Sequence, residues 1–144
     1  MLDRKFFNKL RKDVIPMYRR HIWIDEKDVN DKKFPNYSSA YGIAKRGRKL
    51  KGSAKKWANS KAPALSGLLH NSFDLIETRS DGFKFGTKTY GARVKILAKM
   101  GRLLSTKSQP LPKKIQKFII KEADDYFMKE MKKNFKDRKI DLNI

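Results

Sequence analysis

Residues 63–101 read PALSGLLHNSFDLIETRSDGFKFGTKTYGARVKILAKMG, and this stretch determines the predicted fold. A short helical turn is expected at residues 65–69. An alternating run follows, in which Phe73 and Leu75 share one face of a strand. The dipeptide Asp81-Gly82 then favours a tight type I′ turn, because aspartate and glycine suit the positive backbone dihedrals that this turn requires.

A second alternating run follows the turn and completes a β-hairpin. One face carries Phe83, Phe85, Thr87 and Thr89, and the other carries Lys84 and Lys88. A lone two-stranded hairpin is marginally stable in water, so its aromatic face needs a cover. The longest amphipathic segment, residues 113–135, is the expected cover. The sequence therefore predicts an α+β fold: a small antiparallel sheet built on this hairpin, packed against a long C-terminal helix and an N-terminal helix.

The predicted C-terminal helix has apolar residues at steps of three, four or eight, which is typical of one buried stripe. These residues are Ile115, Phe118, Ile119, Ala123, Phe127, Met131 and Phe135. Ile120 and Met128 lie beside the stripe, and we expect them to widen the buried face.

The N-terminal segment predicts an amphipathic helix of its own, since Leu2, Phe6, Leu10 and Val14 recur every four residues. Asp3 precedes it and can cap its first turn. Pro16 cannot donate the helical hydrogen bond and is expected to end or kink the helix. Residues 18–24 fit either a continued helix or a short strand.

At 144 residues the chain fits a single domain spanning 1–144. We expect a flexible basic loop at 32–61, a short helix at 92–100 closed by Gly101, and an extended C-terminal tail at 137–144. There are no cysteines, which excludes disulfides and thiolate zinc ligation. The sequence contains no apolar run long enough to cross a membrane, so no membrane partner is expected.

The formal net charge is +21 at pH 7, and it is concentrated in two regions. Residues 32–73 contain ten basic side chains and no acid, and residues 82–121 contain eleven and no acid. Such a positive surface attracts nucleic acid, acidic protein surfaces or anionic membranes, and charge alone does not choose among them.

The most basic tract, residues 44–58, reads AKRGRKLKGSAKKWA. One interpretation is phosphate contact, with Trp57 as a stacking residue. The other is a solvated loop whose end Trp57 anchors in the core. The candidate contacts to nucleic acid or to an acidic partner are Lys45, Arg46, Arg48, Lys49, Lys51, Lys55 and Lys56.

The chain lacks the sequence motifs of phosphate loops, zinc proteases and nucleophile elbows. A ribonuclease-like site built on His21 or His70 with nearby lysines is the minor alternative. We expect no enzyme activity, no cofactor and no metal site.

Three short elements carry a resemblance to a known family. The first spans Ser66 to Ser72 and includes Gly67 and Leu68; the second consists of Gly86, Thr87, Tyr90 and Gly91; the third is the pair Pro110 and Pro112. In this order they resemble the neck and tail-completion proteins of tailed bacteriophages, the virion morphogenesis or tail-terminator-like family. The resemblance covers residues 62–135.

The resemblance implies a structural virion protein that forms a homo-oligomeric ring in the phage neck or at the head-proximal end of the tail. Its partners would be further copies of itself, adjoining portal, adaptor or tail ring proteins, and packaged double-stranded DNA. It would be made in the host cytoplasm and located in the virion at the junction of head and tail. The alternative is a stand-alone protein that binds nucleic acid without sequence specificity, which the composition supports equally well.

Overall fold

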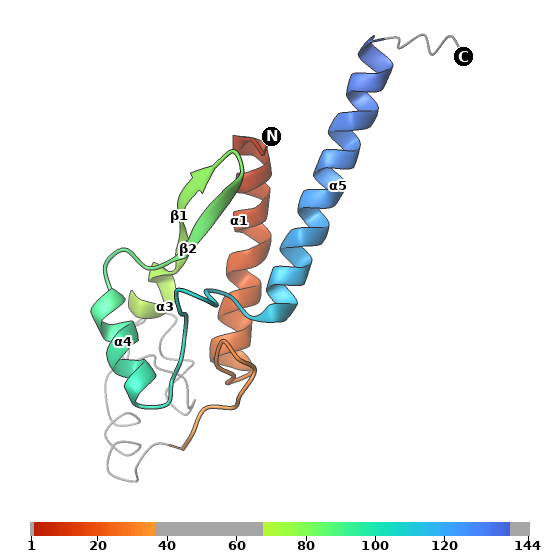
Figure 1. The fold of residues 1–144 in the computed structure, drawn as a ribbon. Helices are drawn as coiled ribbons and strands as arrows, with labels where there is room; N and C mark the ends of the chain where they lie inside the picture. The colour runs from red at the N-terminus through yellow and green to blue at the C-terminus, as the bar shows by residue number, and fades with distance from the viewer. Residues whose placement is uncertain (1, 37–67, 139–144) are drawn as a thin grey trace.

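The computed structural model describes residues 2–36 and 68–138, and it confirms the α+β class. Figure 1 shows the arrangement of its elements. In chain order they are α1 (Arg4–Arg19), the π-helical turn η1 (Arg20–Ile24), α3 (Leu68–Ser72), β1 (Asp74–Arg79), β2 (Gly82–Gly86), α4 (Gly91–Lys99) and α5 (Lys113–Arg138). The two strands form one antiparallel sheet.

Helix α1 begins where the sequence predicts. The backbone N–H of Phe6 donates to Asp3 Oδ1 at 2.9 Å, which caps the helix. Pro16 does not end the helix, which runs on to Arg19 and into η1. Both Pro16 and Lys12, whose carbonyl loses its helical partner, are exposed, so water can satisfy that carbonyl. Of the two alternatives for residues 18–24, the structure shows the continued helix.

The hairpin is present, but its turn differs from the prediction. Arg79 pairs with Gly82, so the two loop residues are Ser80 and Asp81. The predicted type I′ turn at Asp81-Gly82 is wrong, because neither residue has a positive φ.

A bulge in β1 explains how the hairpin separates its apolar and polar faces. Strict alternation would place Leu75 and Glu77 on the same face. The register shifts between these two residues, so Leu75 pairs with Phe85 whereas Glu77 pairs with Lys84. The extra residue turns Glu77 to the exposed face, where its carboxylate forms ion pairs with Arg79 and Lys84.

The hairpin packs mainly on α1, and Tyr18 is at the centre of this contact. Its ring centroid lies 4.7 Å from that of Phe85, 5.0 Å from that of Phe73 and 6.2 Å from that of Trp23. Helix α1 contacts both β1 and α5 and lies between the hairpin and α5 (Figure 1). The principal cover of the aromatic face is therefore α1, where the sequence pattern had pointed to the last helix.

Two connecting segments are held firmly against this core. Arg102 is 3% exposed and donates to the carbonyl oxygen of Pro35 at 2.7 Å. The Gln109 side chain donates to the carbonyl oxygen of Val29. The backbone N–H of Val29 donates to the carbonyl oxygen of Leu103. These bonds join the segment after η1 to the segment between α4 and α5, and they fix where α5 begins.

Gly101 ends the α4 region as expected, with a φ of +81° that favours glycine. The expected loop at 32–61 lies outside the described residues from position 37 onward. Of the expected tail at 137–144, the first two residues belong to α5, and the remainder lies outside the described part.

Helix α5 is covered over only part of its length. Ile115 is buried, Phe118 and Ile119 are half-buried, and Tyr126 packs against Phe6 with ring centroids 5.2 Å apart. Residues 127–134 are all exposed, and this half of the helix extends past α1 and the hairpin (Figure 1). The prediction that Ile120 and Met128 widen the buried face is wrong, since they are 60% and 54% exposed.

Candidate interaction surface

A wide groove of about 860 Å³ opens between the hairpin, α4, the segment after α4 and the first turns of α5. We call it the groove. Its deepest lining residues are Phe73, Phe85, Val94 and Leu111, which are buried and apolar. Apolar clefts of this size are typical binding sites.

The charged residues that line the groove are all cations. Lys84, Lys95 and Lys107 line it, and no acid does so among the residues that the structure describes. Lys84 Nζ lies 3.7 Å from Glu77 Oε2. Hydrogen bonds from Arg79 hold the pKa of Glu77 below its usual range, so this carboxylate stays ionised. Lys95 and Lys107 have no ion pair within the described part of the chain.

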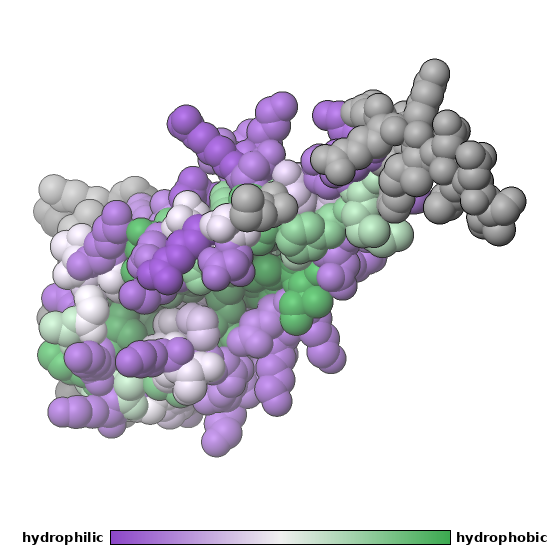
Figure 2. Space-filling model, turned by 45° about the horizontal axis from the view of Figure 1, so that its top comes forward, coloured by the Kyte–Doolittle hydropathy of each residue, from purple (hydrophilic) through white to green (hydrophobic). Residues whose placement is uncertain are grey.

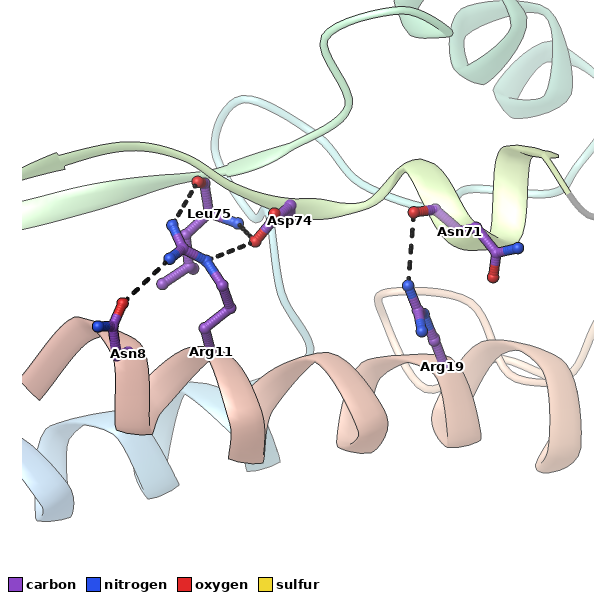
Figure 3. Close-up of polar contacts among 6 residues, drawn as sticks. All are labelled: Asn8, Arg11, Arg19, Asn71, Asp74 and Leu75. Atoms are coloured by element: carbon purple, nitrogen blue, oxygen red, sulfur yellow. Dashed lines mark hydrogen bonds and ion pairs between the residues drawn. The ribbon is translucent and has the colours of Figure 1, made fainter.

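Polar contacts from α1 fix the segment that leads into the groove (Figure 3). Arg11 Nε donates to Asp74 Oδ1 at 2.8 Å, and its second nitrogen donates to the carbonyl of Leu75 at 3.2 Å. Two turns further along, Arg19 donates to the carbonyl of Asn71 at 3.4 Å. These contacts flank Phe73 on both sides and set its depth in the groove.

A second exposed apolar surface lies on the C-terminal half of α5. Phe127, Met128 and Met131 are 40%, 54% and 52% exposed. We call these three residues the exposed stripe; Ile120, which is 60% exposed, lines the groove instead. At about 100° per residue the exposed stripe is centred roughly 150° around the helix from the face that packs on α1. Figure 2 shows apolar side chains gathered in a band on one side of the molecule, bordered by hydrophilic side chains.

Most of the charges beside the exposed stripe are acidic. Asp124 and Glu130 each lie three residues from Phe127, and Asp125 lies three residues before Met128, so all three are about one helical turn away. Lys132, four residues after Met128, is the cation at such a spacing. The exposed stripe is thus apolar with mostly acidic neighbours, whereas the groove is apolar with basic neighbours.

The predicted contact residues lie outside the described residues. They are Lys45, Arg46, Arg48, Lys49, Lys51, Lys55 and Lys56. The second basic region, residues 82–121, is described completely. Ten of its eleven basic side chains are exposed, and the eleventh is the buried Arg102. Three of the exposed side chains, Lys84, Lys95 and Lys107, line the groove.

The described contacts of His21 give the histidine alternative no site geometry, and the side chain of His70 lies outside the described part. His21 is 8% exposed, and its Nε2 lies 2.8 Å from the carbonyl oxygen of Asp28 and 3.4 Å from Asp31 Oδ1. The imidazole therefore fastens the turn after η1. Within the described ranges 2–36 and 68–138 no three His, Cys, Asp or Glu side chains form a group suited to a metal ion. No helix in these ranges is both long enough and apolar enough to cross a bilayer.

The sequence reasoning missed both the groove and the exposed stripe. The groove combines residues from positions 73 to 120, so no local sequence motif predicts it. Helical spacing alone could have predicted the exposed stripe. Ile120, Phe127 and Met131 lie on a different side of the helix from Ile115, Ile119 and Tyr126, and treating all of them as one broad apolar stripe missed this difference.

Residues of the second and third elements of the family resemblance meet at the groove. Gly86, Thr87, Gly91 and Pro110 all line it. The hydroxyl oxygen of Thr87 accepts from the backbone N–H of Tyr90 at 3.3 Å, which shapes the turn between β2 and α4. Comparisons with protein-family models, with curated proteins and with solved structures gave no match.

Proposed function

We propose that this protein is a structural virion component of a tailed bacteriophage that forms a ring in the neck or at the head-proximal end of the tail. The ring joins head and tail around the channel for double-stranded DNA. Its partners are copies of itself, the adjoining portal, adaptor or tail ring proteins, and the packaged DNA.

The observation that carries this proposal is the pair of exposed apolar surfaces on the described part of the chain. The groove and the exposed stripe lie on different parts of the molecule and differ in shape and in charge. Contacts between two different patches of identical copies are heterologous, and they generate rings when the rotation closes. A protein with one such pair is suited to ring formation.

The resemblance supports the same function. Residues of its second and third elements, distant in the sequence, line one groove. This placement gives the two elements a shared role in building a surface.

A second candidate function is binding of nucleic acid by a stand-alone protein. The ten exposed basic side chains of residues 82–121 favour it, because this stretch contains no acid to offset their charge. Each neutralised phosphate contributes about −0.9 to the slope of log affinity against log salt, so six contacts would give a slope of about −5. Replacing Lys45, Arg46, Arg48 and Lys49 with glutamine should flatten that slope if the basic tract contacts DNA.

Electron microscopy of intact particles tests the proposal directly. We expect several copies in a closed ring at the head-to-tail junction, and particles without the protein should have heads and tails that fail to join. The isolated protein should associate weakly, because its net charge of +21 repels other copies. A protein missing from virions, or dispersed singly along the genome, would exclude the ring and favour nucleic-acid binding.

A further inference from the structure

We infer that the groove of one copy receives the exposed stripe of a second copy. The contact would be head to tail, with the C-terminal half of α5 lying against the hairpin, α4 and the segment after α4 of its neighbour. This inference rests on the self-association in the proposed function, but it does not depend on where in a virion the protein is located.

The first argument is chemical complementarity. Phe127 and Met131 offer an aromatic ring and a flexible thioether, and the groove offers the half-buried side chains of Ile76, Phe83 and Leu103. Burying these surfaces against each other removes apolar area from water on both sides. Methionine adapts well to irregular apolar gaps.

The second argument is charge. Asp124 and Glu130 flank the exposed stripe, and Lys95 and Lys107 line the groove without ion-pair partners in the described part of the chain. Opposite charges at a partly desolvated contact select the correct register and orientation. Two grooves facing each other would instead bring like charges together.

The third argument excludes insertion within one copy. Helix α5 has 26 residues and is therefore about 39 Å long. Its early residues Gln116, Ile119 and Ile120 already line the groove of their own chain. Met131 lies about 16 Å further along the same continuous helix, which leads away from that groove (Figure 1). The stripe can therefore reach a groove only in another copy.

Cysteine cross-linking tests this contact, because the natural chain has no cysteine. One population would carry Met131→Cys and a second, of different tagged mass, would carry Ala98→Cys in the groove. Mixing them under mild oxidation should give a disulfide-linked heterodimer, even when association is weak. Phe127→Cys, one turn earlier on the same face, serves as a second position that tolerates a shift in register.

The matched control is Lys133→Cys, on the opposite side of α5. It should give at least tenfold less heterodimer with Ala98→Cys than the stripe positions give. Equal yields from the two sides of the helix would overturn the inference. A double variant, with Met131→Cys and Ala98→Cys in one chain, that links only within itself would overturn it too.

Charge exchange provides an independent test. Asp124→Lys should weaken self-association at least tenfold in sedimentation velocity, because it places a cation against the basic groove. Lys95→Glu should also weaken it, although this change lowers the net positive charge. General repulsion between copies predicts the opposite result for Lys95→Glu, so stronger association of that variant would contradict the inference.

The variant that carries both changes should recover most of the association, since the pair is restored with reversed signs. Failure of recovery would contradict a direct contact. If the stripe positions cross-link but the protein is absent from virions, the proposed function is wrong and the inferred contact is supported. If the protein forms a ring in virions but these cross-links do not form, the proposed function is supported and the inferred contact is wrong.

Discussion

Helices α1 and α5 both carry apolar residues along their whole length, but their surroundings differ. The apolar side of α1 is buried from Phe6 through Tyr18 by the hairpin and by α5. Helix α5 has a comparable supply of apolar side chains, yet beyond Tyr126 they face solvent. The difference teaches that an apolar stripe predicts burial but does not identify the surface that buries it. For α1 that surface belongs to the same chain. For the C-terminal half of α5, in our proposal, it belongs to another copy.

Replacing one buried and one exposed phenylalanine with alanine gives the largest expected effect and tests whether the two apolar regions differ in burial. Phe85→Ala should lower the free energy of unfolding by about 3–5 kcal/mol, because the ring is buried against Tyr18. Phe127→Ala removes the same atoms from an exposed site and should change it by less than about 1 kcal/mol. Chemical denaturation of the isolated protein measures both values, and equal losses would show that α5 belongs to the core throughout.

Tyr18→Phe sharpens the account of α1 with a smaller effect. The Tyr18 hydroxyl is buried and donates to the carbonyl of Leu104 at 2.7 Å. Removing it leaves a buried carbonyl without this donor and should lower the free energy of unfolding by about 1–3 kcal/mol.

The same variant should alter the response to alkaline pH. Burial raises the pKa of Tyr18 well above its ordinary value of about 10. The unfolded chain therefore loses this proton first, so the folding stability of the parent falls as pH rises above about 10. Tyr18→Phe should lack that part of the alkaline loss in denaturation curves recorded between neutral and alkaline pH. Identical pH profiles would place the hydroxyl in contact with water.

Asp3→Asn probes the start of α1, near the point where α5 leaves it, and has the smallest expected effect. The hydrogen bond from the Phe6 N–H, aided by the Tyr126 hydroxyl, lowers the pKa of Asp3. The unfolded chain then binds this proton more readily, so the stability contributed by Asp3 is present above about pH 4 and is lost on further acidification.

Asparagine caps a helix about as well as aspartate but does not titrate. The variant should match the parent near neutral pH after allowance for the lost charge, and it should lose less stability in acid. Thermal melts at neutral and acidic pH would reveal the difference, and parallel losses in both proteins would show that the cap is not made in solution.

Local patterns predicted much of this fold because local chemistry determines it. The four-residue spacing from Leu2 to Val14 gave the buried face of α1, and Asp3 gave its cap. Gly101 marked the end of α4, since its backbone lies in a region that favours glycine. The two alternating runs predicted the hairpin. They did not predict the bulge beside Leu75, which places Glu77 on the exposed face.

The remaining features depend on contacts between distant residues. Nothing in the spacing of residues 113–135 states that Tyr126 meets Phe6 of α1 while Ile120 faces the groove. The choice of α1 as the cover of the hairpin depends on the size of Tyr18 and on its hydrogen bond to Leu104. The groove likewise exists only after residues 73–120 are folded together, so no motif search finds it.

The bond between Tyr18 and Leu104 also sets a time during synthesis of the chain. It joins residues 86 positions apart. Ribosomes add about 5–20 residues per second, so Tyr18 waits roughly 4–17 seconds before its acceptor has been made. For most of that interval the apolar side of α1 has no hairpin to cover it, and throughout the interval it has no α5. The nascent chain is therefore expected to need protection from aggregation earliest at its N-terminus, well before any ring contact can form.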